Sequence, residues 1–142
     1  MSDDPRLNVD PASTLPAVLG FETLETGPDS ATGRFEVTDR VCQPMGVVHG
    51  GAYAAMAEGL TSMATFETVF AEGKMALGQS NQTSFLRPIM SGWVLATARA
   101  IHRGRTSWVW EVEFTDDDGR LCAVTRMTIA VRALPDRAAS AS

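Results

Sequence analysis

Apolar residues follow two different spacings along this chain, an alternation and one unbroken run. The stretch ATGRFEVTDR at 31–40 alternates and places Phe35 and Val37 on one face, as a strand does. Residues 51–72 are apolar nearly all round and are good helix formers, and Gly73 follows them at the position of a C′ glycine. The pattern therefore predicts one long helix over this range, buried on most of its sides.

Apolar and polar residues alternate again on both sides of this run. LPAVLGFETLET at 15–26 predicts a helical turn that continues into a strand. Four strands are predicted after the helix, over residues 75–89, 92–104, 105–119 and 120–133. The last two form a hairpin, because Asp118-Gly119 is a turn pair between them. The expected order is two strands, a long helix and four antiparallel strands.

This order predicts an α+β domain in which a strongly curved antiparallel sheet wraps one long central helix. A single sheet covers only one side of a helix that is apolar all round, so the remaining helix surface and the free sheet edge indicate at least a homodimer. Residues 15–134 are assigned to this domain. Residues 1–14 are expected to form a loose polar arm, and residues 135–142 a disordered tail of small polar residues.

The net charge and its distribution along the chain narrow the classes of binding partner. The chain of 142 residues has a formal net charge of −5, which argues against nucleic acid because phosphate backbones bind basic surfaces. Residues 1–73 hold three arginines and eleven acids, whereas residues 74–142 hold Lys74, eight arginines and six acids. The C-terminal half could therefore hold a small anionic ligand, although an ordinary solvated sheet face explains the same pattern.

No feature of the sequence suggests a membrane, a metal or a disulfide framework. No apolar run reaches the roughly 18 to 20 residues that cross a membrane, and the acidic N-terminus lacks the apolar segment of a signal peptide, which predicts a cytoplasmic protein. Cys42 and Cys122 are interpreted as free thiols. His49 and His102 have no ligand spacing, so no metal site is expected.

The loop VCQPMGVVHGG at 41–51 leads into the helix and carries candidate site residues. The helix start has none of the usual capping residues, so its first N–H groups are expected to be unpaired and to suit an anion or oxyanion. Gly50 and Gly51 would let a ligand approach the backbone, although a plain flexible joint is an equal alternative. Gln43 could donate to a carbonyl or be solvated, and His49 is interpreted as an orienting group in preference to a base.

Glu58 lies among alanines and methionines of the predicted helix. A carboxylate there should be paired, neutral or functional, unless it reaches solvent at the helix edge, and the hydroxyl of Ser62 at i+4 could orient it. About 10 to 12 Å of helix separates Glu58 from the first open N–H, too far for both to act on one group. Two antiparallel helices would bring Glu58 of one chain near Gly50 of the other, which favours a site shared across a dimer interface.

The loop and helix around Gly50 and Glu58 resemble those of a known family. GVVHGGAYAAMAE is similar to the HGG…AE signature of hotdog-fold acyl-CoA thioesterases. The stretches GQSNQTSFLRP, GRTSWVWEVEFTDDDGRLCAV and MTIAVR resemble the same family, so the likeness covers about residues 18–133. The branch it resembles most is the 4-hydroxybenzoyl-CoA thioesterase type with its acid on the central helix, and the phenylacetate-pathway thioesterases are near relatives. The resemblance implies the hotdog fold.

The resemblance also implies catalytic roles. Glu58 would be the catalytic carboxylate, which either attacks the thioester carbonyl or activates a water. The Gly50 N–H would donate to the carbonyl oxygen from the facing subunit. Gln43 matches a family glutamine near the thioester. Ser62 falls where the family places a threonine, so a hydroxyl is kept there.

Further residues are implied to bind the substrate. Arg87 resembles the residue that meets the nucleotide phosphates of coenzyme A, and Gly51 is expected beside the substrate, with His49 in the catalytic loop. Arg105 and Thr106 fall where the family uses a Ser-Thr pair for the nucleotide, so Arg105 is a departure that still suits a phosphate. A family arginine near the C-terminus has no clear match.

The activity implied by the resemblance is hydrolysis of an aromatic acyl-CoA, such as 4-hydroxybenzoyl-CoA, to the free acid and coenzyme A. No metal or redox cofactor is expected, since coenzyme A is part of the substrate, and relatives imply a homotetramer built from two dimers. Two alternatives remain open. One is an acyl-CoA hydratase or dehydratase that uses His49, and the other is an acyl-CoA binding or sensor protein without catalysis.

Overall fold

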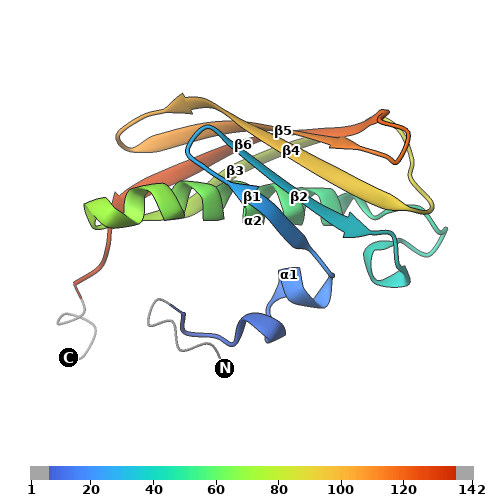
Figure 1. Cartoon of the computed structure of the whole chain (residues 1–142), viewed down its shortest axis with the longest axis horizontal. Coiled ribbons are helices and arrows are strands. Elements are labelled where there is room, and N and C mark those ends of the chain that lie inside the picture. The colour runs from blue at the N-terminus through green and yellow to red at the C-terminus, as the bar shows by residue number, and fades with distance from the viewer. Residues whose placement is uncertain (1–6, 137–142) are drawn as a thin grey trace.

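A six-stranded antiparallel sheet curves over one long helix in the computed structural model, which describes residues 7–136 (Figure 1). The longer elements are, in chain order, α1 (Leu15–Val18), β1 (Glu22–Thr26), β2 (Ser30–Glu36), α2 (Gly50–Val69), β3 (Lys74–Phe85), β4 (Trp93–Arg103), β5 (Ser107–Thr115) and β6 (Leu121–Ala133). Short 3-10 helices also occur at η1 (Pro11–Ser13), η2 (Asp39–Val41) and η3 (Phe70–Glu72). The predicted α+β class and the order of elements are confirmed. The predicted arm and tail fall partly on residues 1–6 and 137–142, which lie outside the described residues.

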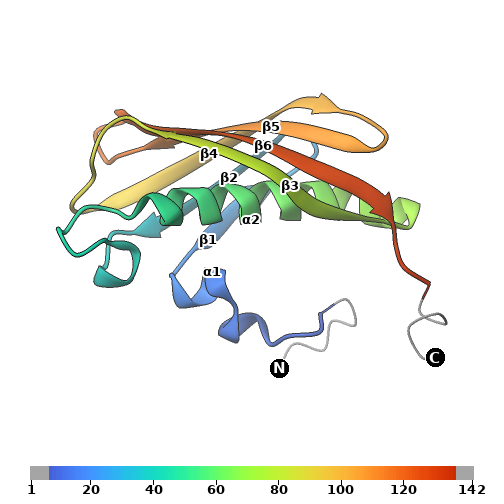
Figure 2. The same ribbon diagram turned by 180° about the vertical axis from the view of Figure 1, so that it is seen from behind.

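The order of the strands leaves β3 at one edge of the sheet. That order is β1-β2-β4-β5-β6-β3, so β3 pairs only with β6 within residues 7–136. A bulge interrupts the register of β3 between Gly78 and Ser80, and such a bulge bends and twists a strand. Seen from behind, β3 runs along α2 (Figure 2). The free edge of the sheet therefore lies beside the long helix.

The alternation along β5 places the large side chains of the core. Four residues of this strand are buried: Trp108, Trp110, Val112 and Phe114. Glu113, between two of them, is exposed, as the sequence pattern predicted. The indole Nε1–H of Trp110 donates to Thr65 Oγ1 on α2 at 2.9 Å. The inner face of the sheet is thus joined to one side of the helix by a hydrogen bond as well as by apolar contact.

Helix α2 is buried on the side that faces the sheet and uncovered on the other. Its buried residues are Ala52, Tyr53, Met56, Ala57, Leu60, Thr61, Ala64, Thr65 and Val69. Glu58, Gly59 and Met63 are exposed. Gly73 has a φ of 71° and ends the helical segment, as predicted for a C′ glycine. The prediction of burial on most sides is wrong for the single chain, because one sheet reaches only one side of a helix.

The β5–β6 hairpin turns at the residues that the sequence indicated. Gly119 has a φ of 77°, a conformation that favours glycine. The carboxylate of Asp116 accepts from the backbone N–H groups of Arg120 at 2.9 Å and Asp118 at 3.0 Å, and from Arg120 Nε at 2.8 Å. These bonds, chiefly the one from the Arg120 N–H, lower the pKa of the Asp116 carboxyl.

Two details near the N-terminal strands differ from the predicted pattern. Strand β2 ends at Glu36, so Val37 lies outside the strand, although its side chain still packs against the core. The predicted loop after it begins with the turn of η2 and contains an antiparallel bridge between Cys42 and Val48. Across residues 7–136, none of the helices has both the length and the apolar character that crossing a membrane requires.

Candidate active site

The loop that enters α2 is held by its own hydrogen bonds. The Gln43 N–H donates to the Val47 carbonyl at 2.9 Å, and the Gln43 carbonyl accepts from the Gly46 N–H at 2.9 Å. The Gln43 side-chain Oε1 accepts from the Met45 N–H at 2.6 Å. Because the amide oxygen is engaged, the amide NH2 is the group that Gln43 can offer to a ligand.

His49 caps the start of α2, which corrects the expectation of an uncapped helix. Its ring Nδ1 accepts a hydrogen bond from the Gly51 N–H at 2.8 Å. A Cβ on residue 51 would lie 2.9 Å from that nitrogen, so Gly51 makes room for the cap and is not an open approach for a ligand. The Gly50 N–H, by contrast, has no acceptor within residues 7–136. One donor is therefore open at this helix end, not two.

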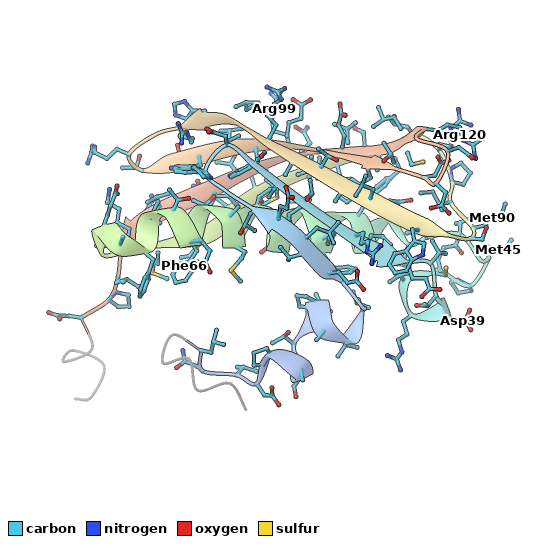
Figure 3. All side chains as sticks on the ribbon, in the orientation of Figure 1. Asp39, Met45, Phe66, Met90, Arg99 and Arg120 are labelled. Carbon is cyan, nitrogen blue, oxygen red and sulfur yellow. The ribbon has the colours of Figure 1, made fainter. Side chains whose placement is uncertain are left out.

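Gly50, Gln43 and Arg87 line one groove of about 420 Å³. The groove lies between the loop before α2 and the end of β3, and its lining is Gln43, Val47, Val48, Gly50, Tyr53, Phe85, Leu86, Arg87 and Pro88. Its walls are mainly apolar. The surface nearby also carries exposed methionines, Met45 at 84 % and Met90 at 69 %, at the same end of the molecule (Figure 3). Three of the residues predicted for the site are thus brought together beside an apolar surface.

Glu58 lies on the uncovered side of α2 and does not line this groove. Its carboxylate contacts the edge strand at Gly78, where an added Cβ would lie 2.9 Å from Glu58 Oε1. The β3 bulge begins at this glycine. Glu58 follows Gly50 by eight residues, which is about 12 Å along the helix axis. In the single chain Glu58 therefore reaches solvent at the helix edge, which was the alternative interpretation of the sequence.

Ser62 does not hold Glu58 in the single chain. Its Oγ is buried and has no hydrogen-bond partner within the described residues. The neighbouring hydroxyl, Thr61 Oγ1, donates instead to the Ala57 carbonyl at 2.7 Å. Ser62 thus keeps an unused, buried donor and acceptor one helical turn after Glu58.

Arg105 and Thr106 line a second, smaller hollow of about 250 Å³ together with Lys74 and Arg132. Arg132 Nη1 donates to the Thr106 carbonyl at 2.7 Å, and Lys74 pairs with Glu72 at 3.3 Å. Lys74 follows the C-terminal end of the helical segment, whereas Gly50 begins it, so the hollow is remote from the first groove in one chain. Lys74 and Arg132 were not singled out from the sequence, although the basic character of residues 74–142 was the signal for them.

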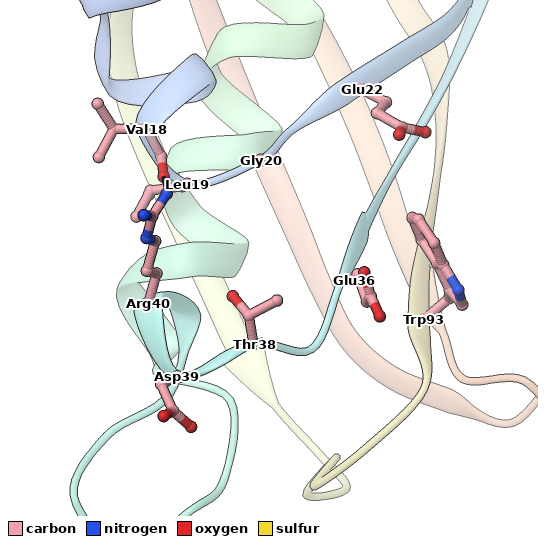
Figure 4. A pocket seen from close by; sticks show the side chains of 9 residues that line it. All are labelled: Val18, Leu19, Gly20, Glu22, Glu36, Thr38, Asp39, Arg40 and Trp93. Atoms are coloured by element: carbon pink, nitrogen blue, oxygen red, sulfur yellow. Dashed lines mark hydrogen bonds between the residues drawn. The ribbon is translucent and has the colours of Figure 1, made fainter.

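A further hollow of about 510 Å³ lies between the turn after α1 and the end of β2 (Figure 4). Glu22, Glu36 and Asp39 make it acidic, and none of the residues predicted for the site lines it. Glu22 is already paired with Arg34 at 2.6 Å. This hollow is larger than the groove at Gly50, but it contains none of the residues that the sequence predicted for the site.

Tyr53 is a residue of the groove that the sequence analysis missed. Its side chain is only 3 % exposed, and its hydroxyl is buried without a hydrogen-bond partner in the described chain. Burial, reinforced by the nearby thiols of Cys122 and Cys42, raises the pKa of Tyr53 to about 12. The available signal was a single tyrosine among alanines, one helical turn after Gly50. Both cysteines are free thiols, as predicted.

Comparisons with known proteins agree on one family. The sequence profile of the thioesterase superfamily matches residues 45–123. The proofreading thioesterase EntH of Cronobacter turicensis is 37 % identical over 125 residues, which cover 88 % of this chain and 90 % of EntH. The crystal structure of thioesterase HI1161 from Haemophilus influenzae superposes with a TM-score of 0.82 at 34 % identity, covering 89 % of this chain and 87 % of that one.

A mutant of thioesterase PA1618 from Pseudomonas aeruginosa has the same TM-score of 0.82, at 36 % identity, over 86 % of this chain and 88 % of that one. The family match at residues 45–123 includes Gly50, Glu58 and Arg87. The chain therefore belongs to the thioesterase superfamily, a family of thioester hydrolases with the hotdog fold.

Proposed function

We propose that this thioesterase hydrolyses an aromatic acyl-CoA, such as 4-hydroxybenzoyl-CoA, to the free acid and coenzyme A. The observation that carries the proposal is the open Gly50 N–H at the start of α2, in the groove that Gln43 and Arg87 also line. An apolar groove suits an aromatic acyl group, and the open donor suits the carbonyl oxygen of the thioester.

The Gly50 N–H would polarise the thioester carbonyl. It sits at the positive end of a helix of 20 residues, where a developing negative charge is favoured. The amide NH2 of Gln43 is a second donor on the wall of the same groove. Together they would stabilise the oxyanion that forms when the carbonyl carbon is attacked.

Glu58 would act either as the nucleophile or as the general base. As a nucleophile, its carboxylate oxygen adds to the carbonyl carbon, the C–S bond breaks, and the departing coenzyme A thiolate takes a proton. Water then cleaves the mixed anhydride and releases the acid. As a general base, Glu58 instead takes a proton from the water that attacks the carbonyl carbon directly. Both routes yield the same products.

The distance between Gly50 and Glu58 supports a site made by two chains. About 12 Å of helix separates them in one chain, so one thioester cannot contact both. Glu58 lies on the uncovered side of α2 and against the edge strand β3. A second copy that paired its β3 with this edge would bring its own helix alongside, antiparallel to the first. The proposed assembly is this homodimer, doubled to a homotetramer.

The phosphates of coenzyme A have two cationic places to bind. Arg87 lies on the wall of the groove, and Arg105 lies with Lys74, Thr106 and Arg132 in the second hollow. Arg105 has no acidic partner among the described residues, so its guanidinium is available for a phosphate. These contacts would hold the nucleotide while the acyl group occupies the apolar groove.

The experiment that tests the function measures thiol release from 4-hydroxybenzoyl-CoA, phenylacetyl-CoA and a saturated acyl-CoA. The Glu58→Gln variant, which removes the charge but keeps the shape, should lose about a thousandfold or more in kcat. Glu67→Gln changes another carboxyl of the same helix and is the matched control, with activity within about twofold of wild type.

Other results would reject parts of the proposal. Equal rates in wild type and Glu58→Gln would remove Glu58 from the chemistry. Tight binding of every substrate without thiol release would identify a sensor. An altered acyl chain with its thioester intact would identify a hydratase.

A further inference from the structure

Among the described residues, the Tyr53 hydroxyl and Ser62 Oγ are the buried side-chain groups without a hydrogen-bond partner, and of these two residues Tyr53 lines the groove. Trp110 Nε1–H is bonded to Thr65, and Thr125 Oγ1 lies 2.8 Å from Thr83 Oγ1. The Tyr53 hydroxyl has no such partner within residues 7–136. A buried hydroxyl without a partner destabilises a fold, so its presence here calls for a ligand or a water that forms the missing hydrogen bond.

Three aromatic rings fix the position of the Tyr53 ring. Phe114 lies 5.2 Å away and Phe35 6.2 Å away, both edge-on, and Phe85 lies 6.1 Å away. The thiols of Cys122 and Cys42 are close enough to act on the hydroxyl electrostatically. Cys42 directly precedes Gln43, which lies on one wall of the groove, and Tyr53 lines the same groove. The Tyr53 ring is thus packed against other aromatic rings, and only its hydroxyl is without a partner in the described residues.

The spacing along α2 places Tyr53 beside the acyl group. Tyr53 follows Gly50 by three residues, about 5 Å along the helix axis, and both residues line the groove. A thioester with its carbonyl at the Gly50 N–H would therefore extend its acyl group past the Tyr53 ring. Phe85 contacts both positions: a Cβ on Gly50 would lie 2.8 Å from the Phe85 ring. Phe85 is 59 % exposed, so its side chain has space in which to turn aside.

We propose that Tyr53 determines substrate specificity, because its hydroxyl forms a hydrogen bond with an oxygen substituent on the far end of the acyl group. The acyl ring displaces Phe85 on entry and so gives its oxygen access to the buried hydroxyl. The proposal rests on the proposed function, since it concerns the acyl pocket of the same site. It accounts for a polar group that the fold itself leaves unpaired.

A double-mutant cycle tests the proposed hydrogen bond between Tyr53 and the substrate. One change of the cycle removes the Tyr53 hydroxyl, and the other removes the hydroxyl of the substrate. The kcat/KM values of wild type and Tyr53→Phe are measured with benzoyl-CoA and with 2-, 3- and 4-hydroxybenzoyl-CoA. For one hydroxylated isomer, Tyr53→Phe should lower kcat/KM about tenfold or more, because the hydroxyl of the bound substrate is then buried without its partner. For benzoyl-CoA the change should stay within about threefold.

Two outcomes would overturn the proposal. One is an equal change for benzoyl-CoA and all three hydroxylated substrates, which would mean that the hydroxyl has only an internal water as partner or none. The other is a loss of activity that parallels a lower unfolding midpoint of Tyr53→Phe. If wild type releases no thiol, the proposed function fails, and the same cycle is then decided by calorimetric dissociation constants of these CoA esters.

Discussion

At the scale of single residues, removing either of two buried hydroxyls of the same core is expected to change the stability in opposite directions. Thr65 Oγ1 donates to the Thr61 carbonyl at 2.8 Å and accepts from Trp110 Nε1–H, whereas the Tyr53 hydroxyl bonds to nothing in the described chain. Thr65→Val should therefore lower the free energy of unfolding by about 1 to 3 kcal/mol, because it leaves a buried indole N–H unpaired. Tyr53→Phe should raise it by about 1 kcal/mol, because it removes an unpaired group.

Denaturant unfolding of both variants at one fixed protein concentration measures these changes, since association also affects apparent stability. Destabilisation by Tyr53→Phe would show that its hydroxyl has a bonding partner in the unliganded protein. An unchanged Thr65→Val protein would show that the indole N–H finds another acceptor.

The sequence marked Glu58 and Gly50 as candidates for the site, but it did not mark the unpaired hydroxyl of Tyr53. Glu58 was recognisable because a carboxylate conflicts with the alanines around it, and this conflict is visible in the sequence alone. A tyrosine suits a core, so a single tyrosine among alanines is only a weak signal of an unusual residue. Whether its hydroxyl finds a partner depends on residues 30 to 70 positions away, such as Phe85 and Cys122, which only the fold brings near.

At the scale of elements, the start of α2 depends on the cap that His49 provides. His49→Ala should lower the free energy of unfolding by about 1 kcal/mol, because the Gly51 N–H loses its acceptor. His49→Asn should restore most of that loss, since an asparagine side-chain oxygen can accept the same bond. Unfolding curves of the pair distinguish a capping role from any other, because a purely catalytic histidine would leave both stabilities unchanged.

The types of the helices and strands were predictable from the spacing of apolar residues, but their neighbours in the fold were not. The alternation along β5, the turn at Asp118-Gly119 and the glycine that ends the helical segment all act locally, so the sequence predicted them. The order of strands, with β3 beside β6, depends on contacts between distant segments. The histidine cap was missed because side chains that usually cap helices are short hydroxyls, amides and carboxylates.

At the scale of the whole molecule, a shared site predicts that two inactive variants restore each other. Gly50→Pro removes the N–H and is tolerated at the first position of a helix. His49 already has a ψ of 133°, the extended conformation that a residue before proline needs. Gly50→Ala is the control, because it adds the same crowding at Phe85 but keeps the N–H.

A mixture of Glu58→Gln and Gly50→Pro chains, exchanged to equilibrium, should recover about a quarter of wild-type activity. Half of the dimers would then be mixed, and each mixed dimer has one intact site of two. Thiol release from the mixture, beside each variant alone, is the measurement. A mixture as inactive as its components would place both groups of a site in one chain and contradict the shared arrangement.

The bond between His49 and Gly51 also fixes which ring nitrogen of His49 holds its proton. An Nδ1 that accepts a hydrogen bond has its lone pair engaged, so the neutral ring carries hydrogen on Nε2. In this tautomer Nε2 carries the hydrogen, so it can donate a hydrogen bond but has no free lone pair. His49 can therefore give a hydrogen bond to a bound carbonyl, but it cannot receive a proton from a substrate unless the helix first loses its cap.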